Sequence, residues 1–260
     1  MNNKLSIITI NYNNLEGLKR TVESVINQTS KEFEYIVIDG GSNDGSGAYI
    51  ESKSEHIDYW VSEPDKGIYN AMNKGIAKAS GEYLLFLNSG DHLFSNNVVK
   101  DNIKNITDCD LVSFDAQVLG VGVDKLWQVP QKLHFSDLYS SSLAHPAVFI
   151  KNGLFNRVGL YDENFKIVSD WKFFILALFK YNCSFKKVDV IFSVFYLDGI
   201  SSDVSNHQLL IEERSQVLNT DFIGYIDDIN QLIELRTIVS NLRKSKKIGL
   251  LVKLGLLHKF

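Results

Sequence analysis

The first 105 residues alternate short apolar segments with polar loops and with segments whose apolar residues recur at helical spacing. The clearest apolar segment is Tyr83–Leu87, which lies between Gly81 and Gly90 and ends in a polar turn. A short run of this kind is typical of a strand buried on both faces, as in a parallel sheet. Repeated strand–loop–helix units therefore predict an α/β fold in which helices flank a mostly parallel sheet with right-handed crossovers.

Polar residues follow these expected strands at their carboxyl ends, where open α/β sheets bind ligands. After Tyr83–Leu87 come Asn88, Ser89 and Asp91. Asp91 can offer carboxylate oxygens to a hard divalent cation, and Gly90 lets the backbone approach a ligand closely. An Asx-type turn that only reverses the chain would use the same residues, so the turn alone leaves both interpretations open.

Composition excludes several other classes of protein. No G-x-G-x-x-G motif follows the first expected strand, Leu5–Ile10, and no P-loop occurs anywhere, which argues against a dinucleotide-binding fold of the common kind. The net charge of -4 does not favour nucleic acid as a partner. Cys109 and Cys183 lack metal-ligand spacing and are expected to be reduced core residues. With no signal-peptide pattern and no apolar run of transmembrane length, the sequence predicts a cytoplasmic protein.

Two parts are expected along the chain. Residues 1–220 form the α/β domain, with a first half at 1–105 and a second at 106–220, and residues 221–260 form a C-terminal helical extension. The tail from Arg243 to Phe260 carries six Lys or Arg residues, no acidic residue and many leucines. This pattern predicts an amphipathic helix on anionic lipid, which would place the protein peripherally on the inner face of the cell membrane. Packing on a partner subunit or on the chain's own domain remains the alternative.

Four motifs occur in a fixed order, each at the boundary of an expected strand or helix. They are Ser6–Asn13, Val37–Ser46, Gly67–Ile76 and Gly81–Asp91. On these motifs the chain resembles the family 2 inverting glycosyltransferases, which have the GT-A (nucleotide-diphospho-sugar transferase-like) fold. The resemblance is strong from Leu5 to about Leu93 and fades after about Ser202. Between these limits it continues more weakly through Ala144–Pro146, Ser169–Phe173 and Gly199–Ser201.

The resemblance implies roles for single residues. Asp170, at the head of an apolar helix, corresponds to the catalytic base, although it could also cap that helix. The implied nucleotide-sugar site comprises Thr9, Asn11, Tyr12, Asp39, Asp65, Asn88, Ser89 and Gly90. The implied acceptor or phosphate side comprises His145, Trp171, Gly199 and Ser201, and a buried, hydrogen-bonded histidine is the equal alternative for His145.

Asp91 stands where the family's D-x-D-type motif binds Mn²⁺ or Mg²⁺. The family often has several acids in this turn, whereas Asn88 and Gly90 leave Asp91 as the only carboxylate here. One carboxylate is enough in principle, because Mg²⁺ is commonly held by one or two carboxylates together with phosphates and waters.

The implied reaction is an inverting transfer of a sugar from a nucleotide-diphosphate donor, most commonly UDP-linked in this family. The acceptor is a hydroxyl of a glycan or of a polyprenyl-diphosphate-linked glycan, in the biosynthesis of a cell-surface polysaccharide such as lipopolysaccharide or capsule. Two alternatives remain. A nucleotidyltransferase usually has a Gly-rich, basic signature after the first strand, which Asn11–Asn14 lacks. A non-catalytic nucleotide-sugar-binding module would fit the reduced metal turn, but Asp39, Asp91 and Asp170 argue against it.

Overall fold

The computed structural model describes residues 4–258. Two compact units divide the chain, Met1–Arg214 and Ser215–Phe260. The first unit contains the whole sheet, and the second contains most of the C-terminal helices. The division of the chain at residues 220 and 221 remains a prediction.

The first half of the sheet is parallel, as the strand–loop–helix pattern predicted. Its strands lie in the order β3-β2-β1-β4. They are β1 (Leu5–Asn11), β2 (Glu34–Asp39), β3 (Tyr59–Ser62) and β4 (Tyr83–Phe86). All residues of β1 and β4 are buried, which explains their continuous apolar character.

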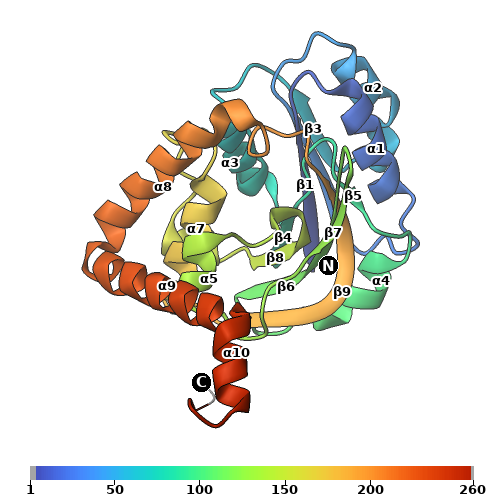
Figure 1. Cartoon of the computed structure of the whole chain (residues 1–260). Coiled ribbons are helices and arrows are strands. Elements are labelled where there is room, and N and C mark those ends of the chain that lie inside the picture. The colour runs from blue at the N-terminus through green and yellow to red at the C-terminus, as the bar shows by residue number, and fades with distance from the viewer. Residues whose placement is uncertain (1–3, 259–260) are drawn as a thin grey trace. The chain divides into compact units, whose positions relative to one another are not determined.

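Helices cover both faces of this parallel half (Figure 1). They are α1 (Leu15–Ile26), α2 (Ser46–Ser52) and α3 (Ile68–Lys78). Because strand side chains alternate, Ile7 packs in one core cluster with Leu18 of α1, whereas Ile8 meets Gly75 of α3 on the opposite face. A Cβ at Gly75 would lie 2.5 Å from Cγ2 of Ile8, so α3 can approach β1 only with glycine there.

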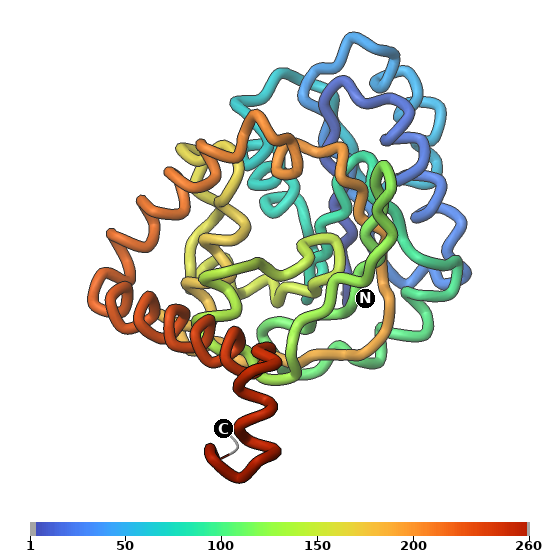
Figure 2. Tube along the Cα trace, in the orientation of Figure 1, coloured from blue at the N-terminus to red at the C-terminus, as the bar shows by residue number. Residues whose placement is uncertain are grey.

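The second half of the sheet is mixed. Strand β8 (Val148–Lys151) pairs antiparallel with β4, and β6 (Leu111–Gly120) pairs antiparallel with β8 and with β7 (Val123–Trp127). The long strand β9 (Phe185–Tyr196) lies beside β6 (Figure 2). It runs parallel to β6 and pairs antiparallel with β5 (His92–Leu93). Strand β6 is continuous, but its register against β9 shifts around Asp115.

The remaining elements of the first unit are short, with one exception. They are α4 (Val98–Asn102), α5 (Phe135–Ser140), α6 (Leu154–Val158), α7 (Ser169–Phe179) and the 3₁₀ turns η1 (Ser54–His56), η2 (Ile103–Asn105), η3 (His145–Ala147) and η4 (Val204–Asn206). The exception, α7, is buried on nearly all sides, as its apolar sequence predicted. Cys109 and Cys183 are free thiols, and Cys183 is buried.

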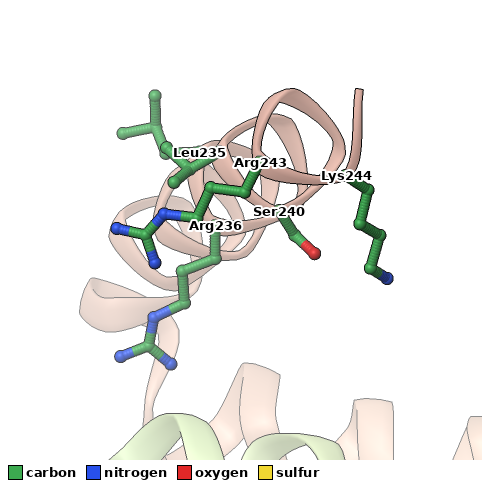
Figure 3. A pocket seen from close by; sticks show the side chains of 6 residues that line it. Leu235, Arg236, Ser240, Arg243 and Lys244 are labelled. Atoms are coloured by element: carbon green, nitrogen blue, oxygen red, sulfur yellow. The ribbon is translucent and has the colours of Figure 1, made fainter. Parts of the chain in front are cut away.

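Three helices occupy the C-terminal part of the chain: α8 (His207–Asp221), α9 (Ile223–Lys244) and α10 (Lys246–Lys253). A pocket of about 430 Å³ lies along α9, and Figure 3 shows the side chains of Arg236, Arg243 and Lys244 at it. The predicted tail includes residues 259 and 260, which lie outside the described residues. Among residues 4–258, no helix combines the length and the apolar character that a membrane span needs.

Candidate active site

A chain of hydrogen bonds joins three neighbouring strand ends of the parallel half. Asn11 closes β1, and its side-chain amide donates to Oδ1 of Asp39 at the end of β2 over 2.7 Å. The hydroxyl of Ser89, in the turn after β4, donates to the amide oxygen of Asn11, also over 2.7 Å. The carboxyl ends of β2, β1 and β4 therefore present one connected polar group, as the sequence motifs predicted for Asn11, Asp39 and Ser89.

Asp39 receives four hydrogen bonds on its carboxylate. Asn11 and the Ser42 hydroxyl donate to Oδ1, and the Ser42 backbone N–H and the Ser62 hydroxyl donate to Oδ2. Burial alone would raise the pKa of Asp39, but the hydrogen bonds from Ser42, Ser62 and Asn11 hold that pKa below its usual value. Asp39 is therefore a fixed, ionised acceptor.

Tyr12 and Asp65 meet at Gly40, directly after Asp39. A Cβ at Gly40 would lie 2.5 Å from Oδ2 of Asp65 and 3.2 Å from Cδ2 of Tyr12, so the glycine makes this close approach possible. Oδ1 of Asp65 accepts from the backbone N–H of Gly67, which precedes α3. The Tyr12 side chain is 67 % exposed and offers an aromatic face beside these carboxylates.

The turn after β4 is held from two sides. Asp91 is buried, and its Oδ1 accepts from the backbone N–H of Tyr196 at the end of β9 over 3.1 Å. Arg20 of α1 donates to the carbonyl of Gly90 and stacks on the Tyr196 ring, with 4.2 Å from Cζ to the ring centroid. Gly90 has φ +113°, a conformation that favours glycine.

The electrostatics of Asp91 fit a cation beside it. Burial raises the pKa of Asp91 to about 8. The charge of Asp198 adds to this shift, whereas the Tyr196 N–H and Arg20 oppose it. Oδ1 of Asn88 is buried and has no hydrogen-bond partner among the described residues. In residues 4–258 there is no group of three or more His, Cys, Asp or Glu residues that could hold a metal. The turn therefore offers one buried carboxyl group and one amide oxygen without a partner among the described residues, which are oxygen ligands of the kind that Mg²⁺ takes.

Asp170 lies in the first turn of α7, with its side chain 24 % exposed. Its Oδ1 accepts from the hydroxyl of Tyr69 in α3 over 3.0 Å, and its Oδ2 lies 3.9 Å from Nδ1 of His145. The alternative of helix capping does not apply, because the cap residue of α7 is Val168 and no side chain caps that end. The carboxylate of Asp170 is thus held by Tyr69 of α3 rather than by its own helix.

His145 is both buried and close to the expected base. Its Nε2 lies 2.9 Å from the hydroxyl of Tyr161, and its ring stacks on Phe86 of β4 at 5.0 Å between centroids. Burial lowers the pKa of His145, although the charge of Asp170 opposes this shift. Burial also raises the pKa of Tyr69 well above its usual value, and the Asp170 charge adds to the shift. Both partners of Asp170 are therefore neutral at pH 7.

Helix α3 connects the two groups. Asp65 lies just before its first turn, and Tyr69 lies within that turn. One turn later, the buried amide of Asn73 donates to the carbonyl of Tyr161 and accepts from its N–H, over 2.8 and 3.1 Å. Asn73 also donates to Glu163. The segment that leads to Asp170 is therefore fastened to the same helix that carries Tyr69.

Four predicted residues do not join these groups. The hydroxyl of Thr9 is fully buried and lies 3.1 Å from the Tyr35 hydroxyl, so the prediction that this side chain contacts the nucleotide is wrong. Trp171 is 2 % exposed and donates to the carbonyl of Leu138, so it supports the site from behind instead of meeting an acceptor. Gly199 and Ser201 lie in an exposed turn after β9, and their predicted role stays a prediction.

Several side chains of the site were not identified from the sequence. They are Arg20, Ser42, Ser62, Tyr69, Tyr161 and Asp198. Ser42 and Tyr69 lie inside motifs that the sequence did mark, so their position was a usable signal. Arg20 and Asp198 gave none, because only tertiary packing brings them to the turn at Gly90.

The parallel half carries a hydrogen-bonded acid at its strand ends, and a mixed half continues the sheet, which is the arrangement of the GT-A fold. Solved structures agree with this fold. Crystal structures of S. aureus TarS superpose with a TM-score of 0.60 and 20 % identity, over 74 % of this chain and 36 % of the longer TarS chain. Mannosyltransferase PcManGT from Pyrobaculum calidifontis, in complex with GDP-Man and Mn²⁺, gives a TM-score of 0.60 and 15 % identity, over 86 % of this chain and 64 % of its own.

Sequence comparison identifies the family. The chain belongs to glycosyl transferase family 2, whose pattern matches residues 6–171. An uncharacterized glycosyltransferase of Mycobacterium tuberculosis is 38 % identical over 181 residues, which are 66 % of this chain and 68 % of the relative. A PGL/p-HBAD biosynthesis glycosyltransferase of Mycobacterium bovis is 30 % identical over 175 residues, 65 % of this chain and 67 % of the relative. The nucleotidyltransferase alternative is thereby excluded.

Proposed function

We propose that this glycosyltransferase transfers a sugar, with inversion, from a UDP-linked donor to a hydroxyl of a glycan or polyprenyl-diphosphate-linked acceptor in cell-surface polysaccharide biosynthesis. One observation carries the proposal: Asp170, partly exposed, is held by Tyr69 in the helix turn that follows the donor-side residue Asp65. A base on α7 that is held by the helix next to the donor-side residue has the fixed position that a single displacement reaction requires.

In this reaction Asp170 is the general base. Tyr69 occupies Oδ1, so Oδ2 is the oxygen that takes the proton from the acceptor hydroxyl. The hydroxyl oxygen forms a bond to the anomeric carbon, while the bond from that carbon to the diphosphate oxygen breaks and the diphosphate keeps the electron pair. His145 and Tyr69, the neutral neighbours of Asp170, leave its carboxylate as the group that accepts the proton.

On the donor side, Asp39 and Asn11 would hold the nucleoside, with Tyr12 beside them. Asp91 and Asn88 would hold Mn²⁺ or Mg²⁺, which when bound offsets the charge of the leaving diphosphate. Related structures support this assignment: TarS residues 1–349 were solved with UDP and with UDP-GlcNAc, and PcManGT with GDP-Man and Mn²⁺. Arg20 and Tyr196 keep the turn in place through Gly90 and Asp91.

The C-terminal helices support a membrane-surface location. Helix α10 combines basic residues with the exposed leucines Leu250 and Leu251, and the exposed Leu254 follows its last residue. The pocket along α9 is lined by basic residues that include Arg243 and Lys244 (Figure 3). Basic helices with exposed apolar side chains bind anionic lipid, and a lipid-linked acceptor lies at such a surface.

Asp170→Asn tests the proposed function. The amide keeps the size of the side chain but cannot take a proton, so turnover is expected to fall by about 10²- to 10⁴-fold. Donor binding, measured by calorimetry with Mn²⁺, is expected to stay unchanged. Asp108→Asn is the matched control, because the Asp108 side chain is fully exposed. Normal turnover in Asp170→Asn would refute the base assignment.

A second assay addresses the non-catalytic alternative. Donor hydrolysis by the wild-type protein, with and without Mn²⁺, should be measurable for an enzyme and absent for a binding module. A thermal-shift panel of nucleotide sugars with Mn²⁺ would identify the donor, and the proposal expects UDP sugars to give the largest shift.

A further inference from the structure

Glu213 of α8 is a buried carboxylate with an unusual set of partners. Its Oε1 accepts from the backbone N–H of Lys166 over 2.7 Å, and its Oε2 accepts from those of Ile167 and Val168 over 3.0 and 3.2 Å. Only 7 % of the residue is exposed. Hydrogen bonds from backbone N–H groups to a carboxylate are strong, so three of them on one side chain fix this backbone segment tightly.

The fixed segment leads directly into the expected base. Val168 is the cap residue of α7, and Asp170 follows two positions later. No side chain caps this helix end locally; instead Glu213, from another helix, accepts from the N–H of the cap residue Val168 and from those of the two residues before it. A negative charge at this end is also favoured by the helix dipole. Glu213 therefore determines where the first turn of α7 begins.

Arg214, the residue after Glu213, contacts Trp171, which follows Asp170 in the first turn of α7. Its guanidinium lies 4.7 Å from the Trp171 ring centroid and donates to the carbonyl of Ser141 over 3.2 Å. Burial lowers the pKa of Arg214, and the charge of Asp170 opposes this shift, which places the guanidinium within electrostatic reach of that carboxylate. Arg214 thus packs on the Trp171 ring and attracts the carboxylate of Asp170.

We propose that Glu213 and Arg214 are positioning residues for Asp170, so that α8 belongs to the catalytic machinery although it follows the family match at residues 6–171. Glu213 sets the backbone that carries Asp170, and Arg214 holds Trp171 and keeps a positive charge near the carboxylate. The inference rests on the proposed role of Asp170 as base. Displacing a reacting group by 1 Å can cost about 100-fold in rate, so loss of either residue should reduce turnover without touching the donor site.

Glu213→Gln is the first test. Glutamine has the same shape, but its NH₂ group would face a backbone N–H, so the three-bond arrangement cannot form. We expect kcat to fall by about 10- to 100-fold while the donor KM stays constant. Amide exchange at Lys166, Ile167 and Val168 should become faster. Glu212→Gln is the matched control: it lies next in sequence, is exposed, and accepts only from Gln208.

A double mutant separates positioning from a general structural role. If Glu213 acts through Asp170, adding Glu213→Gln to Asp170→Asn should not lower the residual turnover further. An equal fractional loss in both backgrounds, or a raised donor KM, would overturn the inference. Arg214→Met and Arg214→Lys extend the test to a second residue, in case Glu213→Gln does not fold. The methionine variant should lose more kcat than the lysine variant, which keeps the charge.

The outcomes also distinguish this inference from the proposed function. Normal turnover in Asp170→Asn would overturn both. Loss of turnover in Asp170→Asn, with wild-type kcat in Glu213→Gln and in Arg214→Met, would overturn the positioning role alone.

Discussion

Ser62→Ala should show how strongly the strand-end network stabilises the protein. The Ser62 hydroxyl donates to Oδ2 of Asp39 over 2.6 Å and is one of four hydrogen bonds on that buried carboxylate. A hydrogen bond to a charged group contributes about 1.5–3 kcal/mol. Alanine at position 62 leaves the other three bonds in place, so the free energy of unfolding at pH 7 should fall by that amount. At the middle of this range, Tm should fall by about 4–8 °C.

The loss should depend on pH in a defined direction. The hydrogen bonds hold the pKa of Asp39 below its usual value, so the folded state favours the ionised form. A carboxylate with a lowered pKa stabilises the fold above its unfolded pKa, and this contribution disappears as pH falls through the folded pKa. The variant raises the pKa of Asp39 toward its usual value. The difference between wild type and variant is therefore complete at neutral pH and shrinks below about pH 4.

Urea unfolding followed by circular dichroism, in steps from neutral to acidic pH, measures both effects. Ser52→Ala is the control, because the Ser52 hydroxyl donates only to the carbonyl of Tyr49 at the exposed end of α2. It should change the free energy of unfolding by less than about 0.5 kcal/mol at every pH. A loss in Ser62→Ala that does not vary with pH would show that Asp39 is not the charge being stabilised.

Two further predictions concern the metal turn and the tail. Asp91→Ala should abolish the Mn²⁺-dependent part of nucleotide-sugar binding, because the cation loses its carboxylate ligand. Calorimetry with and without Mn²⁺ measures this effect. Unchanged metal dependence would contradict the assignment. Removing Arg243–Phe260 should move the protein from the membrane fraction to the soluble fraction, because the basic apolar helix is lost. Binding to anionic vesicles should weaken, whereas binding to neutral vesicles should not change. An unchanged distribution would contradict the proposed membrane anchor.

The sequence predicted the parallel half of the fold well because the signals there are local. Strand β4 is buried on both faces, so its residues form a continuous apolar run, and polar residues follow where it ends. The mixed half has no equivalent signal. Strand β6 pairs with β9 about 70 residues later, and the register shifts around Asp115 are fixed by that distant partner. The sequence pattern gives the presence of such strands but not their pairing.

The candidate site divides in the same way. The closeness of Asn11, Asp39 and Ser89 could be predicted because each lies at or just after a strand end, and strand ends meet at one sheet edge. Thr9 was assigned wrongly, since its side chain points into the layer of Tyr35. Glu213 gave no signal at all, because a glutamate on a helix is normally exposed. Its role comes from three backbone N–H groups more than 40 residues earlier in the chain.

Two asparagines join parts of the candidate site without relying on charge pairs. An amide can donate and accept at once, which neither a carboxylate nor an ammonium group can do. Asn11 donates to Asp39 and accepts from Ser89, so it joins three strand ends. Asn73 donates to the carbonyl of Tyr161 and accepts from its N–H, so it joins α3 to the segment before Asp170. Neither amide is hydrogen-bonded to Asp91 or Asp170 among residues 4–258, so these two carboxyl groups stay available for the cation and the proton of the proposed chemistry.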